Sequence, residues 1–118
     1  MQRLRIGVIA PASIAIKRFM PALRQNKYFI FAGVAFATFE ERSEYETLSF
    51  DEIALKCQAQ QKRAENMVKE YGGKIFKGYH SLLKSNEVDA VYIPLPPALH
   101  YKYAKIAVQN KKHIMLFY

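Results

Sequence analysis

The sequence predicts an α/β fold in which helices cover both faces of a parallel sheet within a single domain. Short apolar runs rich in Val, Ile and aromatic residues alternate with segments of helical periodicity along the chain. Continuous apolar runs are typical of strands buried on both faces, and the strand–helix alternation favours right-handed βαβ crossovers. The chain has 118 residues, which suits one compact domain.

The first strand is predicted over residues 4–10, an apolar run that Pro11 ends. Residues 14–25 have helix-forming composition, and Ser13 is the expected cap of that helix. Pro21 lacks a backbone N–H and falls near the middle of the segment. We therefore expect this first helix in two pieces.

The second strand is predicted over the apolar run 28–37, and a long helix follows it. Ser49 and Glu52 match the capping-box pattern, so the helix should begin there. Gly72-Gly73 should end it. Its later turns carry one apolar face with helical spacing, formed by Ala64, Met67, Val68 and Tyr71.

The remaining elements continue the alternation. A brief strand is predicted over 74–76, a short helix over 80–86, and a buried strand over 88–93 that prolines close. A last helix carries Leu99, Tyr103 and Ile106 on one face, and a last strand begins at His113.

Charge is unevenly distributed along the chain. The net charge is +8, yet residues 38–56 carry six acids against two basic residues, so that the remainder has a charge of +12. The basic residues are spread over many elements, which is typical of solvated surface and does not indicate a nucleic-acid partner. We interpret 38–56 as an acidic exposed loop.

Cys57 is the only cysteine, so the chain can form no internal disulfide and has no zinc-binding cysteine set. A reducing cytoplasm fits this composition. No stretch reaches the roughly 20 apolar residues of a membrane helix, so we expect no membrane association. Neither a metal site nor a catalytic residue is predicted.

The turn after the first strand is the expected place for a phosphate, because helix N–H groups point out of it. A dinucleotide fingerprint reads G-x-G-x-x-G/A, and this chain has only small residues at the three positions, namely Ala10, Ala12 and Ala15. The first position needs a φ that alanine disfavours. The alternative is an ordinary βα turn that binds no nucleotide.

Three ordered segments carry a resemblance to a known family: IGVIAPASIAIKRFMPAL at 6–23, RAENMVKEYGGKIFKGYHSLL at 63–83, and VDAVYIPLPPALHYKYAKIAVQNKKHIML at 88–116. Together they resemble the Gfo/Idh/MocA oxidoreductases, which include glucose-fructose oxidoreductase and inositol dehydrogenase. The resemblance covers nearly the whole chain apart from 38–56, which we interpret as an insertion.

The resemblance implies that residues 1–118 form a Rossmann-like domain that binds NAD or NADP. In the family a larger substrate domain follows, and we expect it to be absent from this chain. At the first turn the expected cofactor contacts are Ala10, Ala12, Ser13 and Ile14. The resemblance further implies that Leu95, Pro96 and His100 lie beside the nicotinamide.

Residues after the second strand should select the cofactor, because an acid accepts the ribose hydroxyls whereas an arginine accommodates a 2′-phosphate. Thr38 and Arg42 suit NADP, while Glu40 and Glu41 suit NAD. The choice between NAD and NADP stays open at this point.

The family's pattern continues into Glu-Lys-Pro and uses that lysine near the reacting carbon, whereas Phe117 and Tyr118 stand here. We therefore expect an NAD(P)-binding domain of an oxidoreductase that acts on the CH–OH group of a sugar or cyclitol. We expect this isolated chain to be inactive, and it is either an expressed fragment or a natural truncation. The alternative is a non-catalytic module of the same fold that dimerises, and a homo-oligomer stays open.

Overall fold

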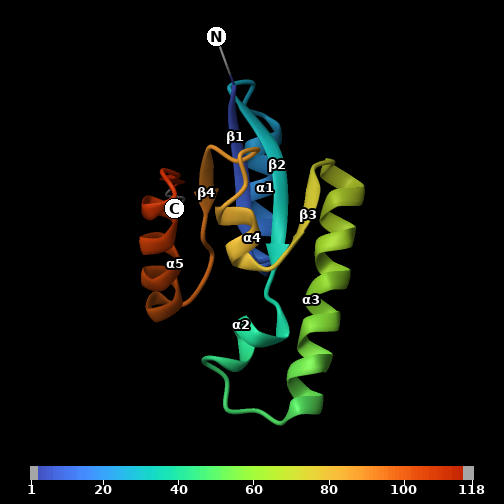
Figure 1. Ribbon diagram of the computed structural model, residues 1–118. Coiled ribbons are helices and arrows are strands. Elements are labelled where there is room, and N and C mark those ends of the chain that lie inside the picture. The colour runs from blue at the N-terminus through green and yellow to red at the C-terminus, as the bar shows by residue number, and fades with distance from the viewer. Residues whose placement is uncertain (1–2, 116–118) are drawn as a thin grey trace.

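The computed structural model describes residues 3–115 and contains one five-stranded, wholly parallel sheet (Figure 1). The strands are β1 (Leu4–Ile9), β2 (Phe29–Phe36), β3 (Lys74–Lys77), β4 (Ala90–Tyr92) and β5 (His113–Met115). Their order is β3-β2-β1-β4-β5. The chain therefore winds outward from β1 in both directions, and the strand order switches between β1 and β4. This is the arrangement of the predicted Rossmann-like class.

Five α-helices and one π-helical segment connect the strands. They are the π-helical segment η1 (Ala15–Phe19), α1 (Met20–Arg24), α2 (Phe39–Ser43), α3 (Phe50–Tyr71), α4 (Tyr79–Leu83) and α5 (Pro97–Gln109). In Figure 1, α5 and α3 flank the sheet on opposite sides, and α2 lies beyond the lower ends of the strands.

Side chains alternate between two cores along every central strand. Ile6, Val8, Val34 and Phe36 join η1, α1 and α3 on one face of the sheet. The neighbouring residues of the same strands, such as Ile9 and Ala35, pack with α4 and α5 on the other. Because both faces are covered, the strands are apolar without interruption, which is why the sequence shows runs rather than alternation.

The first helix confirms the expected division at Pro21 and shows how the chain accommodates it. Residues 15–19 are π-helical and α1 starts at Met20, with Pro21 in its first turn. Met20 keeps helical angles, φ −63° and ψ −43°, so the helical path continues across the junction. Proline has no N–H to donate to the preceding turn, and a π-type turn absorbs that loss without a break.

The long helix α3 begins and ends where the sequence places it. The Ser49 hydroxyl accepts a hydrogen bond from the Glu52 N–H at 3.2 Å, and the Glu52 carboxylate accepts one from the Ser49 N–H at 3.4 Å. At the other end, Gly72 and Gly73 have φ values of +79° and +83°, which favour glycine. The capping box and the glycine stop are both confirmed.

Two regions differ from the expected secondary structure. The segment 38–56 is not simply an exposed acidic loop, because residues 39–43 form α2, residues 50–56 begin α3, and both Glu41 and Arg42 are buried. The predicted strand 88–93 is shorter, since only Ala90–Tyr92 pair with β1 and β5. Val88 and Ile93 are buried beside the strand without extending it, and burial alone made them look like strand residues.

An ion pair joins β1 to the turn before β4 at the amino edge of the sheet. The Arg5 guanidinium donates to both carboxylate oxygens of Asp89, at 3.0 and 2.9 Å, and the Arg5 N–H also donates to Asp89 at 2.9 Å. The side-chain hydrogen bond from Arg5 lowers the pKa of Asp89 to about 2.

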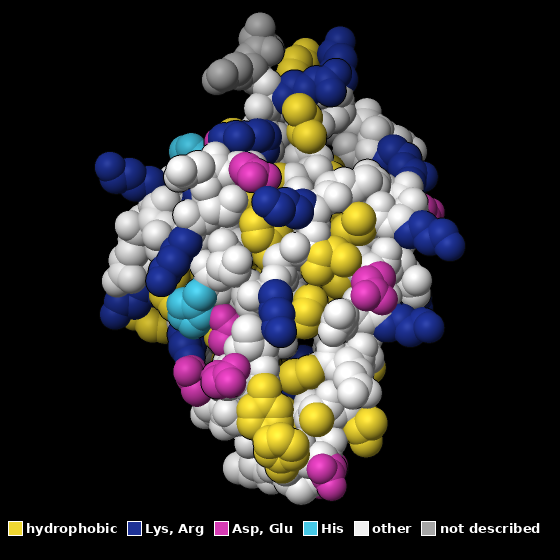
Figure 2. All heavy atoms as spheres, turned by 45° about the vertical axis from the view of Figure 1, so that its right-hand side comes forward, with side chains coloured by type: hydrophobic (Ala, Val, Ile, Leu, Met, Phe, Trp, Pro, Cys, Tyr) yellow, Lys and Arg dark blue, Asp and Glu magenta, His cyan; other side chains and the backbone are white. Residues whose placement is uncertain are grey.

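On the face that Figure 2 shows, basic side chains are scattered and do not form one patch. Large apolar side chains are also exposed at the start of α3, where Phe50 is 71% exposed and its ring lies 4.7 Å from that of Phe39. Among residues 3–115 the helices are all too short or too polar to span a bilayer.

Candidate functional site

A cleft opens at the carboxyl ends of β1 and β4, where the strand order switches. It has a volume of about 310 Å³. Ligands of open α/β sheets bind at such switch points because the flanking loops diverge there and leave a crevice. The lining residues are Ala10, Ala12, Ser13, Arg42, Tyr45, Glu46, Gln60, Arg63, Tyr79, Leu95, Pro96 and Leu99. Six of the nine predicted cofactor residues are among them.

The turn after β1 keeps the backbone conformation of a glycine turn with alanine in place. Ala10 has φ +84°, a conformation that L-residues rarely adopt. Such strain at one residue costs on the order of 1–2 kcal/mol. The surrounding structure holds it, since the Ala10 N–H donates to the Ala35 carbonyl at 2.9 Å and the residue is buried.

The helix after this turn begins at the cleft, which Ser13 lines, and its first N–H groups have no partner within the helix. Its first internal hydrogen bond runs from the Ile16 N–H to the Ala12 carbonyl at 3.1 Å. The N–H groups of Ser13, Ile14 and Ala15 precede that bond and therefore have no acceptor within the helix. This is the geometry that binds phosphate oxygens.

Ser13 does not cap this helix, contrary to expectation. It lies within the first turn, and its hydroxyl accepts a hydrogen bond from the Arg63 guanidinium of α3 at 3.1 Å. Ile14 is 47% exposed and does not line the cleft. Of the four predicted turn contacts, Ala10, Ala12 and Ser13 thus line the cleft, and Ile14 does not.

The opposite side of the cleft follows β4 and is apolar. Leu95 and Pro96, which were predicted to lie beside a nicotinamide, line it together with Leu99 from α5. His100, the fourth residue of α5, donates its backbone N–H to the Pro96 carbonyl at 2.8 Å and is not among the lining residues. We refer to Ala10, Ala12, Leu95, Pro96 and Leu99 as the apolar wall.

A charged network forms the other boundary of the cleft. The Arg42 guanidinium lies 3.2 Å from the Glu46 carboxylate, and the Lys56 ammonium lies 3.2 Å from the same oxygen. The Arg42 side chain is 10% exposed, and its Nε has no hydrogen-bond partner; nor does Glu46 Oε2. Buried polar atoms are normally paired, so this network has unused hydrogen-bonding capacity. We refer to Arg42, Tyr45, Glu46, Gln60 and Arg63 as the polar wall.

Glu41 anchors the polar wall to the rest of the fold. Its carboxylate accepts hydrogen bonds from the N–H groups of Thr38 and Tyr79, both at 2.9 Å, and from that of His80 at 3.1 Å. His80 Nδ1 lies a further 2.6 Å from it. Burial by itself raises the pKa of Glu41, but the hydrogen bonds from His80, Thr38 and Tyr79 outweigh burial, so the net shift is downward.

This network removes two candidates from the cofactor site. Thr38 uses its hydroxyl to cap α2, accepting from the Glu41 N–H at 3.1 Å, and Glu41 uses both carboxylate oxygens within the fold. Glu40 is exposed and does not line the cleft. His80 therefore helps to fix α2 against α4.

Sequence reasoning missed Tyr45, Glu46, Gln60, Arg63, Tyr79 and Leu99. One signal was present, since Glu46 stands four residues after Arg42, the spacing of an ion pair along a helix. Gln60 and Arg63 come from the middle of α3, and no local pattern connects them with the first turn. Burial raises the pKa of the Tyr79 hydroxyl above its usual value, so this group at the cleft stays neutral.

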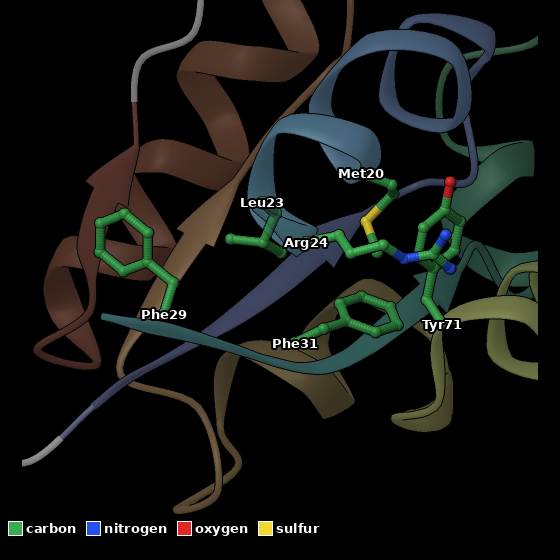
Figure 3. A pocket seen from close by; sticks show the side chains of 6 residues that line it. All are labelled: Met20, Leu23, Arg24, Phe29, Phe31 and Tyr71. Atoms are coloured by element: carbon green, nitrogen blue, oxygen red, sulfur yellow. The ribbon is translucent and has the colours of Figure 1, made fainter. Parts of the chain in front are cut away.

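A second hollow lies away from the carboxyl ends of the strands. Met20, Leu23, Arg24, Phe29, Phe31 and Tyr71 line it, and its volume is about 140 Å³ (Figure 3). The Arg24 guanidinium stacks 4.1 Å from the centre of the Tyr71 ring and donates to the Glu70 carbonyl at 3.1 Å. The Arg24 guanidinium, the one cationic group that lines this hollow, is therefore already engaged in these two contacts. Within residues 3–115 we find no cluster of His, Cys, Asp and Glu suited to a metal ion.

The residues at the switch point fit an anionic dinucleotide. A strained turn exposes helix N–H groups, two arginines line the same cleft, and an uncharged surface lies beside β4. Fold and cleft together define a nucleotide-binding domain of the Rossmann class.

The chain belongs to the Gfo/Idh/MocA family, because residues 27–116 match the family model described as "Oxidoreductase family, NAD-binding Rossmann fold". It is thus an NAD(P)-binding Rossmann-fold domain of an oxidoreductase family. The turn at Ala10 lies outside the matched span.

Curated relatives extend the match over the turn. A dTDP-3,4-didehydro-2,6-dideoxy-alpha-D-glucose 3-reductase of Actinomadura kijaniata is 32% identical over 95% of this chain and 27% of its own length. D-xylose 1-dehydrogenase (NADP(+)) 2 of Haloferax volcanii is 27% identical over 95% of this chain and 28% of its own. The chain therefore spans little more than a quarter of these relatives.

Solved structures agree with the fold. A 3-ketoreductase from Actinomadura kijaniata, in complex with NADP and TDP-benzene, superposes with a TM-score of 0.73 at 29% identity, covering 97% of this chain and 28% of that one. An oxidoreductase from Thermotoga maritima has a TM-score of 0.72 at 23% identity, with 96% and 29% covered. The second match shows the fold alone.

Proposed function

We propose that the cleft binds a nicotinamide dinucleotide in the orientation that the Rossmann topology favours. The pyrophosphate lies against Ala10, Ala12 and the N–H groups of Ser13 and Ile14, and the nicotinamide lies beside Leu95 and Pro96, toward His100. The observation that carries the proposal is φ +84° at Ala10, since an alanine keeps this strained angle where a dinucleotide turn requires it.

The reaction we propose for the complete protein is hydride transfer between this cofactor and a carbinol carbon of a sugar. The bound cofactor supplies or accepts the hydride. This chain's residues bind and orient it, and the apolar side chains of Leu95 and Leu99 exclude water beside its reactive ring. Support for a sugar comes from the relatives, which reduce a dTDP-linked hexose derivative or oxidise D-xylose by name.

We further propose that the 118-residue chain alone binds cofactor without turnover. In the family resemblance, Phe117 and Tyr118 occupy the positions of the Glu-Lys pair, and they lie outside the described residues. A cofactor site without a positioned proton donor lacks general acid–base catalysis. Incubation with NADPH and dTDP-hexoses should therefore leave the nicotinamide absorbance unchanged.

Calorimetric titration of the chain with NADH and NADPH tests the site. We expect saturable binding in wild type, and a loss of about tenfold or more in Ala12→Asp, because the new carboxylate would face the pyrophosphate. Ala22→Asp is the matched control, since it adds the same charge to the exposed face of α1. Equal affinities of the two variants, or no binding in wild type, would contradict the proposed site.

A second candidate function, assembly into a homo-oligomer without catalysis, rests on a different surface. Tyr101 and Val108 on α5 are 71% and 63% exposed, and with Ile114 of β5 they line an open apolar groove. Exposed apolar patches of this kind mark interaction surfaces. A molar mass by light scattering that rises with concentration, and falls in Val108→Lys, would support it, whereas a constant monomer mass would exclude it.

A further inference from the structure

One half of strand β2 has a free edge. Strand β3 pairs with β2 only from Gly33 onward, in a ladder that starts at Lys74. Residues 29–31 of β2 pair with β1 on one side, and within residues 3–115 no strand pairs with them on the other. In Figure 1 the upper half of β2 correspondingly extends beyond β3. This segment therefore offers backbone groups to a further strand.

The backbone of Phe29 and Phe31 faces this free edge. The Leu4 N–H donates to the Tyr28 carbonyl at 3.0 Å, so the Tyr28 carbonyl points toward β1. Successive residues of a strand present their backbone groups to opposite sides, so those of Phe29 and Phe31 point away from β1. The Phe29 N–H donates to the Asn26 carbonyl at 3.3 Å. This leaves the Phe29 carbonyl and the N–H and carbonyl of Phe31 directed to the free edge.

The hollow of Figure 3 lies beside the same half of β2. Phe29 and Phe31 point from one face of the strand toward α1 and line the hollow with Leu23, Arg24 and other residues (Figure 3). Its volume of about 140 Å³ is close to that of an apolar cavity of about 150 Å³ that holds benzene. It therefore has room for one apolar side chain. When a peptide adds to a sheet edge, main-chain bonds give affinity and such side-chain pockets give specificity.

The other open edges of the sheet lack this combination. The outer edge of β3 carries exposed lysines at both ends, Lys74 and Lys77, and charged side chains of this kind protect an edge from further pairing. The described part of β5 is only three residues long. Residues 29–31 carry no charge, and Ile30 is 41% exposed on the opposite face of β2 from the hollow. This edge is therefore the one best suited to an added strand.

Positive charge surrounds the hollow. The charged residues of the segments 24–31 and 70–73 that border it are Arg24, Lys27 and Glu70. Stacking on Tyr71 holds the Arg24 guanidinium in place, and its bond to the Glu70 carbonyl uses one of five N–H donors. Its other donors remain for a ligand, and Lys27 is exposed directly before β2. Carboxylates on either side of an apolar residue would complement these two cations.

We propose that the free edge of β2 and the hollow beside it form a docking site for an extended acidic peptide segment of a partner protein. The segment adds as a strand next to residues 29–31, places one apolar side chain in the hollow and directs a carboxylate to Arg24. The site lies at the amino end of β2, whereas the cleft lies at the carboxyl ends of the strands. The inference therefore goes beyond the proposed function and does not depend on it.

The test titrates an acetylated and amidated peptide of sequence Asp-Val-Leu-Val-Asp into the isotope-labelled 118-residue chain and follows it by NMR. We expect saturable chemical-shift changes at the amides of residues 29–31. Methylation of the peptide's backbone nitrogens removes its main-chain donors and should weaken binding about tenfold or more. Alanine in place of the peptide's leucine should also weaken binding about tenfold, because the hollow is then left unfilled.

Arg24→Glu should lower the affinity for the peptide about tenfold or more, because it replaces the carboxylate's partner with a like charge. Arg18→Glu is the matched control, since it makes the same charge change at an exposed position of η1 that does not line the hollow. It should leave the affinity within about twofold. Circular dichroism checks that both variants fold, and both should bind NADPH as wild type does.

Several outcomes would overturn the inference. Absence of saturable shifts at residues 29–31, or shifts centred on residues 113–115, would show that this edge takes no added strand. Equal weakening in the two arginine variants would reduce the effect to general charge. A molar mass that rises with concentration without peptide, and falls in Arg24→Glu, would show that a second copy of the chain occupies the site. Loss of NADPH binding alone would refute the proposed function and leave this inference standing.

Discussion

The two walls of the cleft differ in what holds them in place. The apolar wall follows directly from strands β1 and β4, which pair with each other at the centre of the sheet. The polar wall comes from α2, the segment after it and α3, and hydrogen bonds of the Glu41 carboxylate connect it to α4. The apolar wall is thus set by backbone pairing, whereas the polar wall depends on a few buried charges.

This difference implies that the two walls carry different parts of the function. Backbone pairing holds the turn at Ala10 and the loop at Leu95 rigidly relative to each other. The parts of the site proposed for the pyrophosphate and the nicotinamide require such rigidity. The polar wall can vary without disturbing the sheet, which suits the part of a site that distinguishes one cofactor from another. Removing an anchor should accordingly harm the polar wall most.

Glu41→Ala should give the largest loss of stability. It would leave four donors on Thr38, Tyr79 and His80 without their shared acceptor, at a cost of about 3 kcal/mol in the free energy of unfolding. Urea denaturation would measure the change. Glu40→Ala, the exposed neighbour on the same helix, should stay within about 0.5 kcal/mol, and a similar loss in both variants would remove Glu41 as the anchor.

Ala10→Gly should act on the apolar wall with a smaller effect and the opposite sign. Glycine adopts φ +84° without strain, so the free energy of unfolding should rise by about 1 kcal/mol. Ala22→Gly, in the exposed part of α1, should lower the free energy of unfolding by about 1 kcal/mol, because glycine has a lower helix propensity than alanine. A loss of stability in Ala10→Gly would show that this turn stores no strain.

The pH dependence of stability should give the smallest effect. The folded-state pKa of Glu41 lies below its usual 4.5, so its ionised form contributes stability that is present above pH 4.5 and is lost as the pH falls further. Glu41→Gln should flatten this part of the curve, measured as the denaturation midpoint between about pH 5 and pH 3. Asp89, with a pKa of about 2, should keep a residual decrease at lower pH in both proteins.

Much of the fold could be predicted because local signals agree with tertiary structure. The capping box at Ser49, the glycine stop at Gly72 and the division of the first helix at Pro21 each depend on neighbours within a few residues. Segment 38–56 could not be predicted in this way. Its six acids indicate solvent, and only the three-dimensional contacts of Glu41 and Arg42 show that two of its charges are buried.

The residues of the candidate site likewise divide into those that local sequence patterns predicted and those that depend on tertiary contacts. Ala10, Ala12, Leu95 and Pro96 were predicted, because motif positions at strand ends converge at one edge of any parallel sheet. Thr38 was named for its hydroxyl, but that hydroxyl caps α2. Arg63 was missed, because it reaches Ser13 across 50 residues of sequence.

The sequence by itself determined the α/β class, the five parallel strands and the edge at which the cleft opens, since hydrophobic periodicity and turn chemistry are local properties. Tertiary structure alone decided that Glu41 joins α2 to α4, that Arg42 is buried in the cleft, and that Glu46 is its partner. These contacts depend on how side chains from distant elements meet in a low-dielectric interior. Burying a charge there costs free energy unless hydrogen bonds compensate for the lost water.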